Sequence, residues 1–154
     1  MRSRLVTPLA LLALVMPLAA CGESEKDKYI DDFKPLNDKL LDLGRDLGTA
    51  VQEADTQEDA ALAKQFGALA KRLDVVNEEI ADLDTPSDLA DEAKQLNGRI
   101  DDAVDDLRAI EKAAQENNAQ DAAAATVQLA TDAEAVNKAQ NKLAKATGAE
   151  VGKS

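Results

Sequence analysis

Apolar residues recur along most of the chain at alternating steps of four and three, a pattern typical of long amphipathic helices. The average step of about 3.5 residues keeps these side chains on one helix face, whereas a half-buried strand would alternate strictly. The first stripe consists of Tyr29, Phe33, Leu36, Leu40, Leu43, Leu47, Ala50 and Ala54. The second stripe consists of Leu62, Phe66, Leu69, Leu73, Val76, Ile80 and Leu83. Each stripe predicts one long helix with a single face turned towards a core.

Two further stripes follow, and alanine supplies many of their positions. The third consists of Leu89, Ala93, Leu96, Ile100, Ala103, Leu107, Ile110 and Ala114. The fourth, which is less regular, consists of Ala122, Ala125, Leu129, Ala133, Val136 and Leu143. Alanine at so many inward positions lets helix backbones approach closely, whereas a ligand pocket needs roughly 300 Å³ or more. The sequence therefore predicts a closed core rather than a pocket.

Short breaks at residues 55–57, 84–86 and 116–118 separate the four stripes. Connections of this length force consecutive helices to run antiparallel. The predicted fold is therefore all-α, an antiparallel up-down-up-down four-helix bundle over residues 29–148. An extended coiled-coil dimer is the alternative, and the short breaks favour closure within one chain, which predicts a monomer.

Residues that cap helices mark the expected starts of the second and third helices. Thr56 with Asp59 three residues later is an acidic variant of the capping box, and it predicts the start of the second helix. Proline suits the first position of a helix, where its missing N–H would be unpaired anyway. Pro86, with Thr85 before it as the cap, therefore predicts the start of the third helix.

Other backbone signals fall at the ends and in the middle of the predicted helices. Asn118 is expected to cap the fourth helix, and Gly148 is its natural stop. Pro35 is expected either to open the main part of the first helix or to kink it near its start. Gly44 and Gly48 form a pair of small residues four apart, which favours close packing against a neighbouring helix.

Residues 1–20 have the parts of an export signal. Arg2 and Arg4 supply a positive start, and residues 5–20 form an almost unbroken apolar run of 16 residues that ends in small residues before Cys21. This run contains two prolines and is shorter than the roughly 20 apolar residues that span a membrane. A cleaved signal is therefore expected rather than a transmembrane helix.

The end of this signal, Leu18-Ala19-Ala20-Cys21, resembles the lipobox of bacterial lipoproteins, in which a leucine and two small residues precede a cysteine. The resemblance covers residues 1–22. It implies cleavage before Cys21 and a diacylglycerol in thioether linkage to its sulfur. Because two acyl chains anchor a protein stably where one binds reversibly, the membrane becomes a partner through covalent lipid.

These observations divide the chain into four expected parts. Residues 1–20 are the signal peptide, residues 21–28 the lipidated cysteine and a spacer, residues 29–148 the bundle, and residues 149–154 a frayed tail. The expected location is the outer face of the bacterial cell membrane, on the envelope side.

The composition argues against several classes of protein. The chain carries 30 acidic and 18 basic residues, and loss of the signal would remove two basic ones and leave a net charge of about −14. Such a charge opposes binding to nucleic acid and to anionic membrane surfaces, which need basic patches. There is no His, no Trp and one Cys, so imidazole bases, cysteine nucleophiles, zinc sites and the usual haem ligands are missing. We expect no enzyme activity, no cofactor and no metal.

Two clusters of charge on the predicted helix surfaces have alternative interpretations. The acidic cluster consists of Asp101, Asp102, Asp105 and Asp106. It could bind a divalent cation weakly, but no loop with calcium spacing accompanies it, so a solvated acidic face is favoured. The basic cluster consists of Lys138, Lys142 and Lys145. It could touch phospholipid head groups, or it could simply complement the dipole of the fourth helix.

The predicted body is similar, in pattern rather than in any signature motif, to small helical-bundle lipoproteins of actinobacteria. Two functions remain open. The first is a non-enzymatic lipoprotein that binds a still unknown protein partner, or spaces it from the membrane, through its acidic helical surface. The alternative is an envelope lipoprotein that binds a small molecule or a cation, on its acidic faces or in a cleft between helices.

Overall fold

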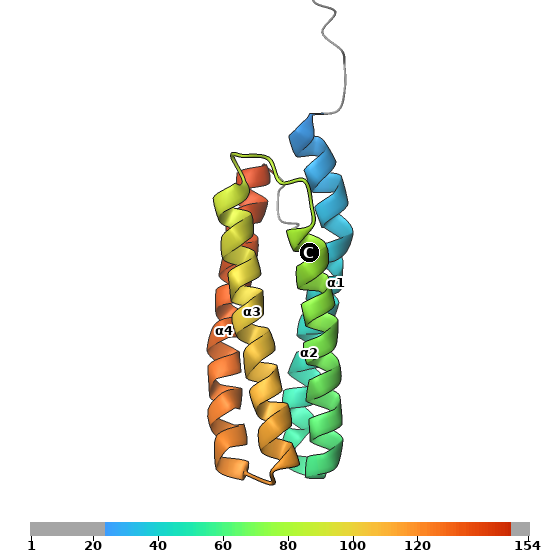
Figure 1. Cartoon of the computed structure of the whole chain (residues 1–154), viewed down its shortest axis with the longest axis vertical. Helices are drawn as coiled ribbons and strands as arrows, with labels where there is room; N and C mark the ends of the chain where they lie inside the picture. The colour runs from blue at the N-terminus through green and yellow to red at the C-terminus, as the bar shows by residue number, and fades with distance from the viewer. Residues whose placement is uncertain (1–23, 149–154) are drawn as a thin grey trace, which may run out of the picture.

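The computed structural model describes residues 24–148, apart from the side chain of Asp55, and over this range it contains helices and no strand. The elements are α1 (Glu25–Glu53), a short 3₁₀ turn η1 (Ala54–Thr56), α2 (Asp59–Ala81), α3 (Ala90–Gln115) and α4 (Ala119–Thr147). The four long helices run alternately up and down, as Figure 1 shows. The predicted all-α four-helix bundle is therefore confirmed. The predicted signal peptide, the lipobox with Cys21 and the tail after Gly148 lie outside the described residues.

Helix α1 begins earlier than its apolar stripe predicts. The Asp27 N–H donates to Oγ of Ser24 at 3.1 Å, and the Ser24 N–H donates to Oδ2 of Asp27 at 3.4 Å. This reciprocal capping box starts the helix at Glu25, so the last four residues of the expected spacer belong to the bundle. Pro35 lies inside the continuous helix on an exposed face. It costs α1 one backbone hydrogen bond but does not end it.

The predicted capping pair of the second helix is wrong. Thr56 remains part of the turn that ends the first helix, and its hydroxyl donates to the carbonyl of Glu53 at 2.9 Å. Helix α2 starts at Asp59, and its N-cap residue, Glu58, makes no side-chain cap. Because the 3₁₀ turn η1 extends α1 as far as Thr56, this residue does not serve as the N-cap of α2.

The predicted start of the third helix is also displaced. Pro86 is buried in the connection, and its carbonyl accepts the Leu89 N–H at 2.9 Å, so a turn separates it from the start of α3 at Ala90. Thr85 does not cap the helix, because its hydroxyl donates to the Leu83 carbonyl at 3.2 Å. Burial of Pro86 and Leu89 thus takes precedence over the local preference for proline at a helix start.

Both predicted ends of the fourth helix are confirmed. The Asp121 N–H donates to Oδ1 of Asn118 at 3.2 Å, so the asparagine caps α4. Gly148 follows the last turn with φ +77°, the left-handed conformation that glycine adopts without steric cost.

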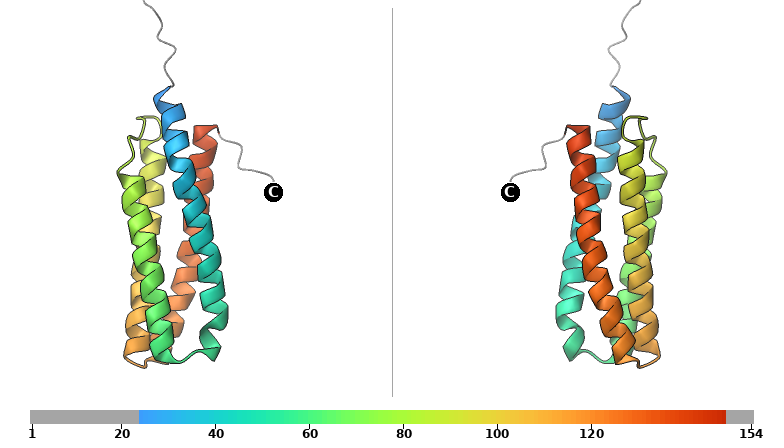
Figure 2. Two further views of the ribbon diagram at one scale, coloured as in Figure 1. Left: turned by 90° about the vertical axis from the view of Figure 1, so that its right-hand side faces the viewer. Right: turned by 90° about the vertical axis from the view of Figure 1, so that its left-hand side faces the viewer.

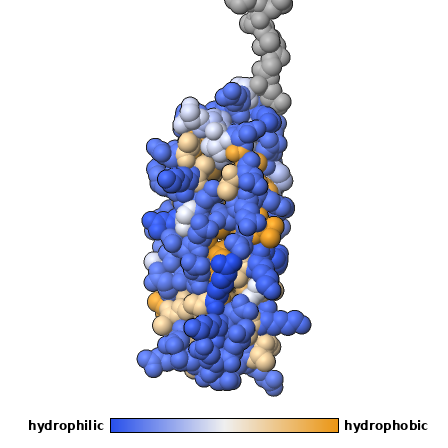
Figure 3. Space-filling model, in the orientation of Figure 1, coloured by the Kyte–Doolittle hydropathy of each residue, from blue (hydrophilic) through white to orange (hydrophobic). Residues whose placement is uncertain are grey.

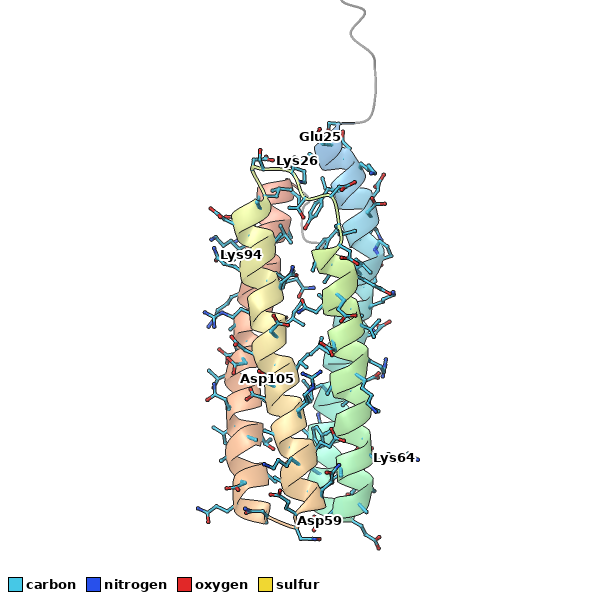
Figure 4. All side chains as sticks on the ribbon, viewed as in Figure 1. Glu25, Lys26, Asp59, Lys64, Lys94 and Asp105 are labelled. Carbon is cyan, nitrogen blue, oxygen red and sulfur yellow. The ribbon has the colours of Figure 1, made fainter. Side chains whose placement is uncertain are left out.

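The predicted apolar stripes line the core, and charged residues cover the outside. The largest fully buried side chains are Tyr29, Phe66, Ile80, Leu89, Leu96, Ile100, Val104, Leu107, Leu129 and Leu143. Figure 3 shows that the α2–α3 face of the surface is mostly hydrophilic. In Figure 4, Lys64, Lys94 and Asp105 project away from the helices. The described bundle therefore carries a hydrophobic core of its own.

The four helices do not pack equally well. Helix α3 lies closely against both α2 and α4, whereas α1 touches α2 less and α4 least. Figure 2 shows that α1 and α4 are inclined to each other. The start of α1, the connection 82–89 and the end of α4 share one end of the bundle, and the turns 54–58 and 116–118 share the other (Figure 1). We call the first of these the Ser24 end.

Candidate functional site

The sparse contact between α1 and α4 leaves a cleft that reaches the core. Its volume is about 330 Å³. It is lined by Leu40, Leu41, Leu43, Gly44, Arg45, Leu47, Leu69, Leu73, Ala103, Leu107, Ala133, Val136, Asn137 and Gln140. All four helices thus contribute to what we call the α1–α4 cleft, with α2 and α3 at its floor. The expected closed core is wrong at this place, because alanines that let α4 approach α3 leave α4 too thin to fill the space towards α1.

Leucine side chains dominate the wall of the cleft and are incompletely covered. Leu47 and Leu73, which belong to the predicted core stripes, are only half-buried. Leu41 on the rim is 44% exposed. Water therefore reaches apolar surface that a four-helix bundle would ordinarily bury. Each Å² of apolar surface left in water forgoes about 25 cal/mol of stabilisation.

Polar contacts tie α1 to α4 on the side of the cleft towards the Ser24 end. Gln140, which is buried in the wall, donates from Nε2 to Oδ1 of Asn37 at 2.6 Å. Nearer the Ser24 end, Lys26 donates from Nζ to the Ala146 carbonyl at 2.7 Å. The neutral amide pair of Gln140 and Asn37 therefore closes the cleft on this side, and beyond it the Lys26 ammonium group, which also lies 3.8 Å from Asp88, joins α1 to α4.

Arg45 is the one charged residue among those that line the cleft. Its side chain is 74% exposed, and its guanidinium forms an ion pair through one nitrogen with Asp42, three residues earlier on the same helix. A guanidinium carries five N–H donors, so this single contact leaves donors free to face a second anion.

The glycine pair of α1 does not pack against a neighbouring helix, contrary to the prediction. A Cβ atom at Gly44 or at Gly48 would meet no atom within 4 Å beyond its own helix. Gly44 instead lines the cleft, and its missing side chain widens the opening. Gly44 thus belongs to the cleft, and neither glycine forms a helix contact.

A second hollow of about 460 Å³ lies at the end of the bundle opposite Ser24. Its wall includes five alanines of α3 and α4, together with Val51 of α1 and with Leu62 and Phe66 of α2. Asn118 in this wall is already engaged in capping α4. Asp59, the first residue of α2, is the one charged residue among those that line it. This hollow therefore offers mostly apolar surface with a carboxylate in its wall.

The acidic cluster of α3 does not come together as a cation site. Asp102 pairs with Arg99 at 3.1 Å, Asp105 with Arg108 at 3.6 Å, and Asp101 accepts from Nδ2 of Asn77 at 2.6 Å. Among residues 24–148, no group of three or more acidic, histidine or cysteine side chains could hold a metal ion. The favoured interpretation as a solvated acidic face thus agrees with the geometry of three of the four aspartates.

Asp106 is the exception, because it turns towards α4. The residue is half-buried, and its Oδ2 is buried without a hydrogen bond. Burial raises the pKa of Asp106 to about 6, and the neighbouring Asp132 carboxyl of α4 adds to the increase. Two carboxyl groups can hydrogen-bond to each other only when one is protonated. A neutral Asp106 could therefore donate a hydrogen bond to the Asp132 carboxylate.

The basic cluster of α4 is largely paired within the protein. Lys142 lies 3.4 Å from Glu92 of α3 and also donates to Oε1 of Gln95 at 3.1 Å. Lys138 pairs with Glu134 one turn earlier at 3.4 Å. These lysines are therefore partly neutralised before any lipid head group is considered.

Within the described range, no helix combines the length and the apolar character needed to span a membrane. No protein-family model matches the chain, and no curated protein or solved structure is significantly similar to it. The function is therefore inferred from the α1–α4 cleft and the charges around it.

Proposed function

We propose that this protein is a lipid-anchored envelope lipoprotein that works without catalysis and binds a small apolar molecule in the α1–α4 cleft. The observation that carries this proposal is the leucine-lined cavity of about 330 Å³ between α1 and α4. Ligand pockets in proteins have volumes of about 300–1,000 Å³ and mostly apolar walls with a few polar groups. The cleft falls at the lower end of this range and has such a wall.

The anchor half of the proposal rests on the lipobox that ends at Cys21. Because α1 begins at Glu25, only three residues would separate a lipidated Cys21 from the first helix. The Ser24 end would then lie at the membrane, with the turns 54–58 and 116–118 at the distal end. An apolar molecule that leaves the membrane would meet the cleft partway along the bundle.

Energetics favour an occupant in this cleft. Each methylene group that leaves water contributes about 0.8 kcal/mol, and the leucines that it covers gain as well. A chain of several methylenes therefore offsets the several kcal/mol that association costs in lost motion. The half-buried Leu47 and Leu73 and the exposed Leu41 are the side chains that a ligand would cover.

A second candidate is the binding or spacing of a partner protein, the function that the sequence favours. The hollow at the distal end supports it, because Val51 in its wall is 37% exposed and Val127, elsewhere on α4, is 71% exposed. Exposed apolar residues around a hollow are common where proteins meet.

The test of the proposed function compares a cleft-filling variant with a matched surface variant. The body from Ser24 onward is titrated with decanol while the melting temperature is followed, because a ligand that binds only the folded state raises it. Ala133→Leu places a larger side chain in the wall of the cleft, and Ala130→Leu makes the same change at an exposed position of α4.

Wild type and Ala130→Leu should be stabilised by decanol, whereas Ala133→Leu should need at least about tenfold more, a difference of about 1.4 kcal/mol in binding. An equal response of all three proteins, or none, would refute binding in the cleft. A helical peptide or an envelope protein that binds at the distal end while decanol fails would favour the second candidate.

A further inference from the structure

We infer that the ligand of the α1–α4 cleft is a single hydrocarbon chain with an anionic head group, which Arg45 holds at the rim. This inference rests on the proposed function and names the class of molecule that the same site takes. It is carried by the distribution of charge around the cleft: an apolar interior, the neutral pair of Gln140 and Asn37 on one side, and one cation among the residues that line it.

The cleft has a direction that suits an amphiphile. Towards the Ser24 end, the buried Gln140 is already bonded to Asn37, and the Lys26 ammonium group beyond it is engaged by the Ala146 carbonyl and by Asp88. Arg45 lies further along α1 than Leu40 and Leu43, which line the interior. A chain lying among these leucines would place its head beside the guanidinium and keep the head in contact with water.

The charge at the rim complements an anion. No acidic residue lines the cleft, and Arg45 is its one charged wall residue. The chain has a net charge of −12, so a positive charge without an acidic residue in the same wall differs from the acidic character of the chain as a whole. Asp42 engages one nitrogen of the guanidinium, and the remaining N–H donors match the geometry of a carboxylate or phosphate.

The size of the cleft favours a chain over a protein segment. An α-helix with its side chains is about 10–12 Å across, so a docking helix would require α1 to move away from α4. The bonds of Asn37 with Gln140 and of Lys26 with Ala146 hold these helices together. A flexible chain needs no such movement.

The experiment measures head-group preference with probes of one chain length. Decanoate, decanol and decylamine are titrated, below the concentrations at which they form micelles, against the body from Ser24 onward. The variants are Arg45→Gln and, as a matched control, Arg99→Gln. Arg99 also pairs with an aspartate three residues away on one helix, Asp102, but it does not line the cleft.

For wild type and Arg99→Gln, decanoate should bind about fivefold more tightly than decanol, the gain expected for one solvent-exposed ion pair. Arg45→Gln should abolish this preference and leave decanol affinity unchanged, and Arg45→Lys should restore part of it. Equal affinity for decanoate and decanol, tighter binding of decylamine, or an unchanged preference in Arg45→Gln would overturn the head-group inference. Failure of wild type to bind any of the three probes would instead overturn the proposed function.

Discussion

The Asp106 carboxyl group should make the bundle more stable as the pH falls from 7 to 5. Its pKa is raised from 3.8 to about 6, by burial first and by the Asp132 carboxyl next. The folded state therefore favours the protonated form. The stabilisation from protonation is complete below the unfolded pKa near 3.8 and is lost as the pH rises through about 6.

The size of the effect follows from the pKa shift. One pKa unit corresponds to about 1.36 kcal/mol. Between pH 7 and pH 5, Asp106 takes up its proton in the folded state but hardly at all in the unfolded state, and this difference in proton binding is worth nearly one such unit. Asp106 is only half-buried, so solvent screening reduces the expected gain to about 1 kcal/mol.

Replacing Asp106 by asparagine removes the charge and supplies an amide donor to Asp132. Asp106→Asn should raise the free energy of unfolding at pH 7 by about 1 kcal/mol and should lack the gain on acidification. Urea denaturation at pH 7, 6 and 5 measures both effects. Asp32→Asn, at an exposed position of α1, is the control and should retain the pH dependence of wild type. A wild-type stability that falls from pH 7 to 5, or an Asp106→Asn variant that is less stable at pH 7, would show that folding does not raise the pKa of Asp106.

Three further predictions concern the core, the cleft and the anchor. Leu107→Ala should cost about 2–5 kcal/mol because Leu107 is fully buried, and Leu73→Ala roughly half as much because Leu73 is only half-buried; equal costs in chemical denaturation would mean that Leu73 is covered as well as Leu107. Gly48→Ala should stabilise α1 by about 0.5–1 kcal/mol, since its Cβ meets open space, and a loss would mean that a helix packs there. Cys21→Ala should abolish labelling with a fatty-acid analogue in bacterial cells, and undiminished label would exclude lipidation at Cys21.

The helices were predictable because their spacing is fixed by the need to bury one face of each. Tyr29, Phe66, Leu96 and Leu143 are buried where the stripes place them. Asn118 was predictable for a local reason, since its side chain caps the chain only three residues away. The early start of α1 also had a visible signal, the Ser24–Asp27 capping box, which the apolar stripe beginning at Tyr29 obscured.

Features that depend on distant parts of the chain could not be predicted in the same way. Thr56 and Pro86 carry local preferences for helix starts, but the extension of α1 and the burial of the 82–89 connection decide where these helices begin. The pairing of Asp106 with Asp132 joins α3 to α4 and has no counterpart in the spacing of either helix.

The α1–α4 cleft has the weakest signal in the sequence. Alanine in the fourth stripe suggests close packing, which holds against α3 but fails against α1. Which neighbouring helix an alanine-rich helix such as α4 approaches depends on how all four helices are inclined. Gly44 could have suggested an opening, but a small residue favours close contact just as well until its surroundings are known.

Methyl NMR of the body from Ser24 onward, titrated with decanoate, tests binding in the α1–α4 cleft most directly. The methyl signals of Leu47, Leu73 and Val136, which line the cleft, should shift in a saturable way. Those of Leu89 and Leu96, buried elsewhere in the core, should stay in place. Shifts spread over all the methyl groups, or none at Leu47, Leu73 and Val136 at saturating decanoate, would contradict the proposed binding site.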